Sequence, residues 1–241
     1  MKKVALVLAA MLVGLAGCVS QPVTSSENTN PKPAVSQPIA IIDWVDFMKL
    51  NDITYLSASR TNSIKESDLS PYAEIKFKVA DNVNDSSYRI KNGDAAYLEA
   101  GTPVYALKDY DPSFRLVVKR YGTFLIFESD TNPNAKKGSD LLDINGKVDF
   151  ISVNSAVDGK TVLASIKDPM QVVSLVTLVL AAPVDQSSRI TGKEQYFLEF
   201  HLKDGTSTER SFWLDTGIMI RGIKLPQQFT AAVRLALSKQ Q

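Results

Sequence analysis

The chain has 241 residues and is almost neutral, with 27 lysines and arginines against 26 aspartates and glutamates. This balance argues against a nucleic-acid-binding protein or a polybasic membrane surface, because both require clustered cations. A single histidine and a single cysteine also exclude the usual zinc sites and an internal disulfide. With 44% hydrophobic residues, the length suffices for one large domain or two small ones.

The N-terminal segment has the pattern of a secretion signal. Met1-Lys2-Lys3 precedes an uncharged apolar run from Val4 to Gly17, as in a signal peptide with an apolar core of about 7–15 residues. A permanent membrane span requires about 20 apolar residues, so this run is short for one. Leu15-Ala16-Gly17-Cys18 resembles the lipobox of bacterial lipoproteins.

The lipobox resemblance implies that residues 1–17 are a signal peptide and that Cys18, the first mature residue, carries diacylglycerol on its sulfur. Two acyl chains hold a protein stably on a bilayer, at about 0.8 kcal/mol per buried CH₂. We therefore expect a protein anchored through Cys18 to the extracytoplasmic face of the cell membrane. The alternative is an ordinary signal peptide with a chance cysteine. Residues 18–38 comprise the lipidated cysteine and a tether rich in proline and serine, which we expect to be disordered.

From Ile39 onward the pattern predicts a strand-rich α+β fold with antiparallel hairpins. Alternating apolar and polar residues over 74–79 predict a half-buried strand. A turn at Asp158-Gly159 leads into a predicted strand at 161–166. The predicted hairpins have a glycine-containing turn between their strands, and they are 114–120 with 123–128, 141–144 with 147–154, and 196–202 with 206–214.

Two helices are predicted to pack on the sheet. Asp168-Pro169 is a helix start, and the apolar segment after it ends at Pro183. Its polar residues form one narrow stripe, so we expect a sheet to cover most of this helix; they are Gln171, Ser174 and Thr177. Pro226 opens a second helix, whose apolar face consists of Phe229, Val233 and Leu237.

The polar loop Ser129–Ser139 is the best candidate for a boundary between two halves. It would separate a β-rich subdomain of residues 39–130 from an α+β subdomain of residues 139–241, and one continuous domain is the alternative. The segments VDFMKLN (45–51) and VDFISVN (148–154) are identical at four of seven positions. Either chance or an ancient duplication would explain this.

The sequence lacks the common catalytic signatures G-x-S-x-G, Ser-x-x-Lys, G-x-x-x-x-G-K-[ST] and G-x-G-x-x-G. A histidine-based triad would need His201, the only histidine. The alternation over 196–203 predicts that His201 lies on the more polar face of its strand, beside Glu199. We interpret it as a surface residue, with a role as ligand or catalytic base as the alternative.

Carboxylate chemistry stays open, since three close acidic pairs occur: Asp81 with Asp85, Asp109 with Asp111, and Asp140 with Asp143. Asp130-x-Asn132-x-Asn134 resembles the start of a calcium loop, but Ala135 and Leu141 occupy the positions of the required glycine and glutamate. Because aspartate and asparagine also favour turns, solvated loops are the simpler interpretation of all these residues.

Trp44 and Trp213 are the remaining candidates for ligand binding. An exposed tryptophan pair could stack on the rings of a wall glycan or on a protein partner. Core packing is the commoner place for a tryptophan in a strand. Both interpretations are kept for these two residues.

The segments IKNGDAAYLEAGTPVYALKDYDPSFRLV (90–117) and YFLEFHLKDGTSTERSFWLDTG (196–217) resemble uncharacterised lipoproteins of Gram-positive spore-forming bacteria. This resemblance implies a cell envelope with one membrane, where Cys18 would hold the protein on the outer leaflet. It implies no activity and no functional residues.

We expect a non-enzymatic binding or accessory module of the cell envelope, without cofactor or metal, whose partner is an envelope protein, a peptide or a wall polymer. A carboxylate-dependent wall hydrolase is one alternative. For a glycosidase, it requires two acidic side chains in one cleft, about 5–9.5 Å apart. A structural or sensory ectodomain is the other, marked by a large exposed apolar patch.

Overall fold

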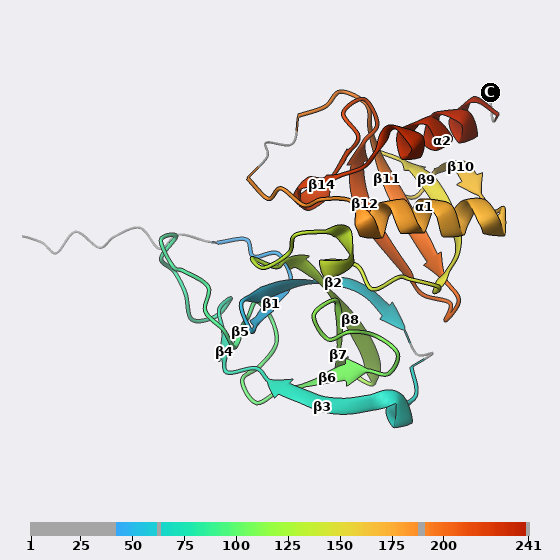
Figure 1. The fold of residues 1–241 in the computed structure, drawn as a ribbon. Helices are drawn as coiled ribbons and strands as arrows, with labels where there is room; N and C mark the ends of the chain where they lie inside the picture. The colour runs from blue at the N-terminus through green and yellow to red at the C-terminus, as the bar shows by residue number, and fades with distance from the viewer. Residues whose placement is uncertain (1–41, 62–63, 188–190, 240–241) are drawn as a thin grey trace, which may run out of the picture. The chain divides into compact units, whose positions relative to one another are not determined.

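The computed structural model describes residues 42–61, 64–187 and 191–239. The signal peptide, the lipidation of Cys18 and the tether are predictions that lie outside these residues. The described chain is strand-rich, with two helices packed on sheet (Figure 1), which confirms the predicted α+β class. None of the described helices is both long and apolar enough to cross a membrane.

Within the described chain, the first sheet has eight strands in the order β3-β6-β7-β8-β2-β1-β5-β4. The strands are β1 (Phe47–Leu50), β2 (Ile53–Thr61), β3 (Leu69–Glu74), β4 (Phe77–Lys78), β5 (Asp94–Ala95), β6 (Pro103–Leu107), β7 (Arg115–Arg120) and β8 (Thr123–Thr131). The short 3-10 helix η1 (Glu66–Asp68) precedes β3. Neighbouring strands are antiparallel except β4 and β5.

The predicted hairpin of 114–120 with 123–128 is confirmed by β7 and β8. Tyr121 and Gly122 join them, and both have positive φ, 51° and 76°. A two-residue turn with positive φ at both positions matches the right-handed twist of its strands. β8 continues to Thr131, so the polar loop starts at Asn132, three residues later than the predicted Ser129.

The strand predicted over 74–79 is wrong as a single element. The alternation identifies burial correctly, since Ile75 and Val79 are fully buried. The backbone, however, changes partners within this run: β3 ends at Glu74 beside β6, and Phe77 begins the parallel pairing of β4 with β5. A period of two reports which side chains are buried, and it does not report which strand lies alongside.

The second sheet has six strands among the described residues, in the order β10-β9-β11-β12-β13-β14. They are β9 (Val148–Ser155), β10 (Val162–Ile166), β11 (Gln195–Leu202), β12 (Ser207–Trp213), β13 (Ile218–Met219) and β14 (Ile223–Lys224). The predicted strand at 161–166 and the hairpin of 196–202 with 206–214 are confirmed. The 3-10 helices η2 (Gly138–Asp140) and η3 (Ile220–Gly222) lie before β9 and between β13 and β14.

The strand predicted at 141–144 is wrong. Leu141, Leu142 and Ile144 are buried, but their backbone is irregular. The turn at Asn145-Gly146 exists, with Gly146 at φ 70°. No hairpin forms there: β9 pairs with β11 along one edge and with β10 at residues 151–154 of the other edge, and residues 141–144 pair with neither edge.

Both helices, α1 (Pro169–Ala181) and α2 (Gln227–Ser238), pack on one face of the second sheet (Figure 1). Asp168 caps α1 as predicted, since its Oδ1 accepts a hydrogen bond from the Gln171 N–H at 2.8 Å. The core between helices and sheet includes Ile151, Val153, Leu198, Phe200 and Phe212 of the strands, and Val172, Leu175, Val176, Val179, Phe229 and Val233 of the helices.

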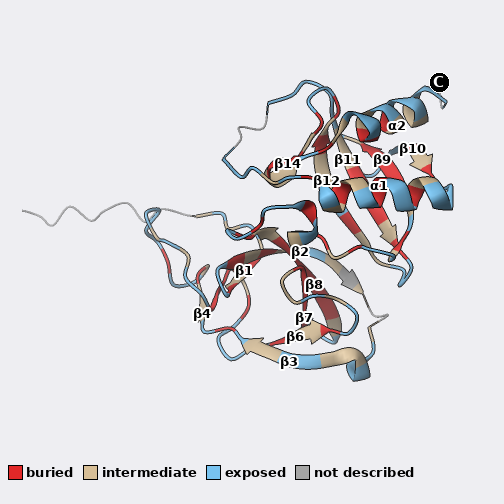
Figure 2. Ribbon diagram, viewed as in Figure 1, coloured by how far each residue is buried: buried red, intermediate tan, exposed pale blue. Residues whose placement is uncertain are grey.

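The sheet covers α1 less completely than the narrow polar stripe predicted. Met170 is 83% exposed and Val173 is 62% exposed, beside the polar residues of that stripe. Figure 2 shows the exposed residues along the outer side of the helix. The helix therefore has one covered face and one open face, and its open face is partly apolar.

Residues Ile39–Gln241 group into one compact unit by their contacts. Within it, the first sheet spans residues 47–131 and the second spans residues 148–224. The face of the second sheet opposite the helices carries mostly polar side chains, because strand residues alternate between the two faces. That open face and the junction between the sheets contain the candidate sites.

Candidate functional site

A buried ion network joins the two sheets. Arg115 of β7 is 0% exposed and Glu128 of β8 is 3% exposed. Their Nη2 and Oε1 atoms are 2.6 Å apart, and Nη1 of Arg210 on β12 lies 3.0 Å from Glu128 Oε2. One carboxylate thus bridges two guanidinium groups through charge-assisted hydrogen bonds. We call these residues the Arg115–Glu128–Arg210 network.

Further hydrogen bonds complete the network. Thr208 Oγ1 donates to Glu128 Oε2 at 2.6 Å, and Arg115 Nη1 donates to Thr206 Oγ1 at 2.8 Å. The Arg115 guanidinium also lies 4.6 Å from the centre of the Tyr110 ring, within the range of a cation–π contact. These contacts hold β12 against β7 and β8, so the network has a structural role.

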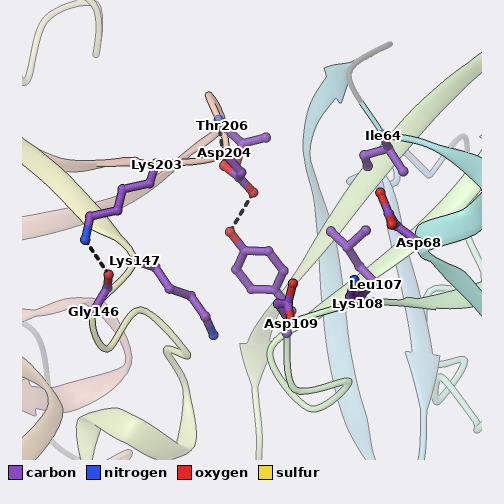
Figure 3. Close-up of a pocket in the computed structure, with 11 residues that line it drawn as sticks. Ile64, Asp68, Leu107, Lys108, Asp109, Gly146, Lys147, Lys203, Asp204 and Thr206 are labelled. Atoms are coloured by element: carbon purple, nitrogen blue, oxygen red, sulfur yellow. Dashed lines mark hydrogen bonds between the residues drawn. The ribbon is translucent and has the colours of Figure 1, made fainter.

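One groove at the junction, the Tyr110 groove, has a volume of about 430 Å³. Figure 3 shows side chains from both sheets facing it, with Asp204 and Lys203 on one side and Asp68 and Leu107 on the other. It is lined by Ile64, Asp68, Leu107, Lys108, Asp109, Tyr110, Gly146, Lys147, Lys203, Asp204 and Thr206.

Most polar groups of the Tyr110 groove already have partners. The Tyr110 hydroxyl donates to Asp204 Oδ2 at 2.6 Å, and burial and this contact raise the pKa of Tyr110. Lys147 pairs with Asp143 at 2.6 Å, and Lys203 donates to the Gly146 carbonyl at 2.8 Å (Figure 3). We interpret this groove as part of the sheet junction.

A second groove of about 430 Å³, the Glu199 groove, lies between β2 and β8 on one side and β12 and η3 on the other. β12 pairs with β13 only at Phe212 and Trp213, so the side of residues 207–211 that faces away from β11 carries no strand among the described residues. The groove is lined by Leu56–Ser59, Glu128–Asp130, Phe197, Glu199, Ser207, Glu209–Ser211, Ile220 and Arg221.

Two glutamates stand directly opposite each other in the Glu199 groove. Glu199 of β11 and Glu209 of β12 are register partners on the open face of the second sheet. Like charges in this position destabilise a sheet. Glu209 makes no ion pair within 4.0 Å among the described residues, and Glu199 approaches only His201, at 3.5 Å.

Asn154 of β9 connects the two carboxylates. It is 1% exposed, and its Nδ2 donates to Glu199 Oε2 at 2.9 Å. Ser207 Oγ donates to the other Glu199 oxygen at 2.7 Å. A Cβ built on Gly159 would lie 3.7 Å from both carboxylate oxygens of Glu209, so this side chain folds back across the sheet. The Asn154 Oδ1 atom is buried without a hydrogen-bond partner in the described chain.

The two carboxyl groups have opposite pKa shifts. Burial acts to raise the pKa of Glu199, but hydrogen bonds from Ser207 and Asn154 and the proximity of His201 outweigh it, so the pKa is lowered. The pKa of Glu209 is raised, first by burial and then by the charge of Glu199. Arg210 and the Asn154 amide only partly oppose this effect. The folded protein therefore favours the ionised form of Glu199 and disfavours the ionised form of Glu209.

His201 does not complete a serine–histidine–acid triad. Ser152 Oγ lies 2.9 Å from His201 Nε2, and Glu199 Oε2 lies 3.5 Å from the same nitrogen. A triad needs the serine on one ring nitrogen and the acid on the other. The imidazole stacks on Phe150, with ring centres 3.9 Å apart. His201 lies on the open polar face beside Glu199, as the alternation predicts.

The two candidate tryptophans lie in different parts of the fold. Trp44 is half-buried and packs on Phe47, with ring centres 5.9 Å apart, and its indole nitrogen is buried without a partner in the described chain. Trp213 at the end of β12 is half-buried against Gly192, where an added Cβ would lie 2.5 Å from its ring. Since both are partly covered, they do not form an exposed pair.

The acidic pairs singled out in the sequence are used in turns or surface ion pairs. Asp85 accepts from the Ser87 N–H at 2.8 Å, and Asp140 accepts from the Lys136 N–H at 2.8 Å. Asp111 and Asp143 are joined by a 2.8 Å hydrogen bond from the Asp111 backbone N–H. Asp81 lies 2.5 Å from the ammonium of Lys78.

The calcium-like segment also has local partners. Asp130 pairs with Arg221, whose Nε donates to Oδ1 at 2.9 Å. Asn132 Oδ1 accepts from the Asn134 N–H at 3.0 Å. In the residues that the structure describes, no group of three or more histidine, cysteine, aspartate or glutamate side chains is placed to hold a metal ion.

Comparison with protein-family models, with curated proteins and with solved structures yields no match to this chain. The function must therefore be argued from the site alone. The sequence patterns placed Glu199 on a polar face but did not identify Glu209, Asn154 or the Arg115–Glu128–Arg210 network. The pairing of Glu199 with Glu209 depends on the exact register of the hairpin.

Proposed function

We propose that this protein is a lipid-anchored, extracytoplasmic binding module of the cell envelope, and that its ligand binds in the Glu199 groove. The observation that carries the proposal is the Glu199–Glu209 pair, two opposed carboxylates in an open groove. A repulsive pair of this kind weakens the fold, and groups that cost stability are concentrated at functional sites. The lipobox at Cys18 supports the anchored location.

The architecture around the groove supports binding. The Arg115–Glu128–Arg210 network fixes the strand that carries Glu209, and the buried Asn154 orients Glu199. A site held on strands by such contacts keeps its geometry when a ligand arrives, which lowers the entropic cost of binding. A binding function of this kind requires no catalytic residue.

Cosedimentation of the purified chain with isolated cell walls tests the binding proposal. The variant with both Glu199→Gln and Glu209→Gln should lose most of its wall binding, because it keeps the shape of the groove and removes its charge. Glu74→Gln is the matched control, since Glu74 is an exposed glutamate at the end of β3. Equal binding by the double variant and the control would contradict the site.

The anchor is tested separately with labelled fatty acid in cells. Cys18→Ser should abolish incorporation of the label, because serine lacks the sulfur that forms the thioether. The body should still fold, as judged by circular dichroism. Unchanged labelling of the variant would refute the anchor and leave the groove proposal standing.

A carboxylate-dependent wall hydrolase is the second candidate, favoured by the opposite pKa shifts of Glu199 and Glu209. In such a pair the raised carboxyl acts as acid and the lowered one as base or nucleophile. The test is release of reducing ends from purified wall glycan. A hydrolase would lose this release in Glu209→Gln while still binding the wall, whereas no release by the unmodified protein would exclude this function.

A further inference from the structure

The strand β10 is a free edge of the second sheet. It stands at one end of the strand order, beside β9, and in the described chain no strand pairs with its other side (Figure 1). The backbone N–H and C=O groups on the outer side of an edge strand are open to pairing with another strand. No residue of β10 lines the Glu199 groove, so this edge is a separate surface.

The other three edge strands among the described residues are protected against such pairing. β3 contains Pro71, ends at Glu74 and has a bulge between Pro71 and Ala73. β4 has only two residues, and an isolated β-bridge joins Val184 to Ile223 of β14. Proline, charge, bulges, short length and coverage are the features by which native proteins prevent edge-to-edge association.

β10 has fewer of these protective features. The segment from Thr161 to Ile166 contains neither a charged residue nor a proline, although its pairing with β9 has a bulge at Leu163. Two apolar side chains of the strand reach solvent, since Val162 is 54% exposed and Leu163 is 36% exposed. An uncharged, apolar edge of this kind favours the addition of a strand.

The helix that follows β10 continues the uncharged surface. β10 ends at Ile166 and α1 begins at Pro169. No residue of α1 is charged, and its exposed side includes Met170 and Val173. A surface helix usually carries charged residues on its solvent side, and exposed apolar patches mark interaction sites. We call the free edge of β10 and the exposed start of α1 the β10–α1 surface.

We propose that the β10–α1 surface binds a second copy of this chain, with the two β10 strands antiparallel across a two-fold axis. Such an interface uses the same surface on both copies. A free edge is completed by an extended backbone, which a lipid or a glycan does not supply. Because β10 is uncharged, the two paired strands place no like charges opposite each other.

The charges at the two ends of β10 fit an antiparallel pair. Lys160 precedes the strand and Asp168 follows it. Antiparallel pairing places the beginning of one strand beside the end of the other, so Lys160 of each copy lies near Asp168 of the second copy. Asp158 and Lys167 stand at the same two ends with exchanged signs, and they also meet as opposite charges. A parallel pair would instead bring like charges together.

The exposed apolar side chains meet in the same arrangement. The end of β10, from which α1 starts, lies beside the beginning of β10 in the second copy. Met170 of one copy therefore lies near Val162 of the other, and contact removes both from water. A short strand and one end of a helix make a small interface, so the dimer should be weak.

Sedimentation velocity of the purified full chain over a range of concentrations tests the inference. All samples carry Cys18→Ser, so that neither a lipid nor a disulfide links two copies. The sedimentation coefficient should rise with concentration toward that of a dimer. Val162→Lys should weaken self-association at least about tenfold, because it places two ammonium groups in the paired edge. Val45→Lys is the matched control, since Val45 is also exposed and lies outside both sheets.

A second variant guards against loss of folding. Val162 and Met170 are both mainly exposed, so lysine at either position should leave the circular dichroism spectrum unchanged. Met170→Lys lies on the helix and leaves the strand intact, and it should also weaken self-association. Val45→Lys should associate as the unmodified chain does.

Three outcomes would overturn the inference. A monomer at every concentration would exclude the second copy. Equal self-association of Val162→Lys, Met170→Lys and Val45→Lys would place the dimer contact on another surface. A monomer whose Val162→Lys variant loses binding to isolated cell walls would assign the free edge to a strand of a different protein. None of these outcomes bears on the Glu199 groove, which is tested by its own variants.

Discussion

Glu209 and Arg210 are neighbours in β12, but their side chains lie on opposite faces of the strand and in opposite electrostatic situations. Arg210 contacts the buried carboxylate of Glu128, which also binds Arg115. Glu209 faces the carboxylate of Glu199. On one face two cations share an anion, and on the other two anions oppose each other. One strand therefore carries both the ion network that holds the sheets together and the pair that we assign to ligand binding.

The two faces differ in what their charges do for the folded protein. Breaking a buried pair leaves an uncompensated charge away from water, which is strongly destabilising. The Glu199–Glu209 pair borders an open groove, so solvent screens its repulsion and its cost in stability is smaller. The network should thus govern stability, and the glutamate pair should govern binding. Substitutions on either face of β12 can separate these roles.

The largest effect is expected for Glu128→Gln, which removes the carboxylate paired with Arg210 and leaves the buried Arg115 only the more distant Asp204, 3.7 Å from its Nη1. The free energy of unfolding should fall by about 3–5 kcal/mol. Urea unfolding followed by circular dichroism measures this, with Glu74→Gln as the control for loss of an exposed glutamate. A loss below about 1 kcal/mol would show that the network does not hold the sheets together.

Thr208→Val should have the next largest effect. Thr208 is 1% exposed, and its hydroxyl donates to Glu128 Oε2 at 2.6 Å. Valine keeps the shape and removes the donor, so the unfolding free energy should fall by about 1.5–3 kcal/mol. Wall binding by the folded fraction should not change. In the Glu128→Gln background the same substitution should cost less, and equal costs in both backgrounds would argue against a shared network.

Sequence patterns predicted the hairpin of β11 and β12 but not the contacts that give it a role. A two-residue turn at Asp204-Gly205 would place Glu199 opposite Arg210. In the structure the loop has three residues, because the Leu202 N–H donates to the Thr206 carbonyl at 2.7 Å and Gly205 has φ 82°. This shift by one residue places Glu199 opposite Glu209. A glycine-containing turn is compatible with both loop lengths. The local sequence therefore does not determine whether Glu199 lies opposite Arg210, which would attract it, or opposite Glu209, which repels it.

Other differences have the same physical origin. The patterns identified burial at Ile75 and Leu141 correctly, since apolar residues report where the core lies. They misassigned strands there because pairing depends on which edges remain free in the assembled sheet. Arg115 and Arg210 are far apart in the chain, and a buried arginine has no local signature. Long-range pairing, more than local conformation, limited the prediction of both fold and site.

Glu209→Lys tests the opposite face of β12, and its effect on stability should be smaller and of opposite sign. A lysine opposite Glu199 replaces repulsion by attraction, so the unfolding free energy should rise by about 0.2–1 kcal/mol. Wall binding should fall at least as much as in Glu209→Gln, because the introduced ammonium competes for the carboxylate of Glu199. If Glu209→Lys were more stable and still bound cell walls, the Glu199–Glu209 pair would have no role in ligand recognition.

The smallest effect is a pH dependence with opposite signs for the two glutamates. The folded-state pKa of Glu209 is raised above its ordinary value of 4.5, so its contribution to stability is present below that value and is lost as pH rises through the raised pKa. The folded-state pKa of Glu199 is lowered, so its contribution is present above 4.5 and is lost as pH falls through the lowered pKa.

At neutral pH, Glu209→Gln should therefore be slightly more stable than the unmodified protein and Glu199→Gln slightly less stable. Each difference should stay below about 1 kcal/mol, since both side chains contact solvent. Both should disappear in acid, where the native carboxyls are protonated and resemble glutamine. Urea unfolding from acid to neutral pH measures the two curves. If both variants shifted stability in the same direction, the two carboxyls would not have the opposed environments that distinguish this face of β12 from the network on the other.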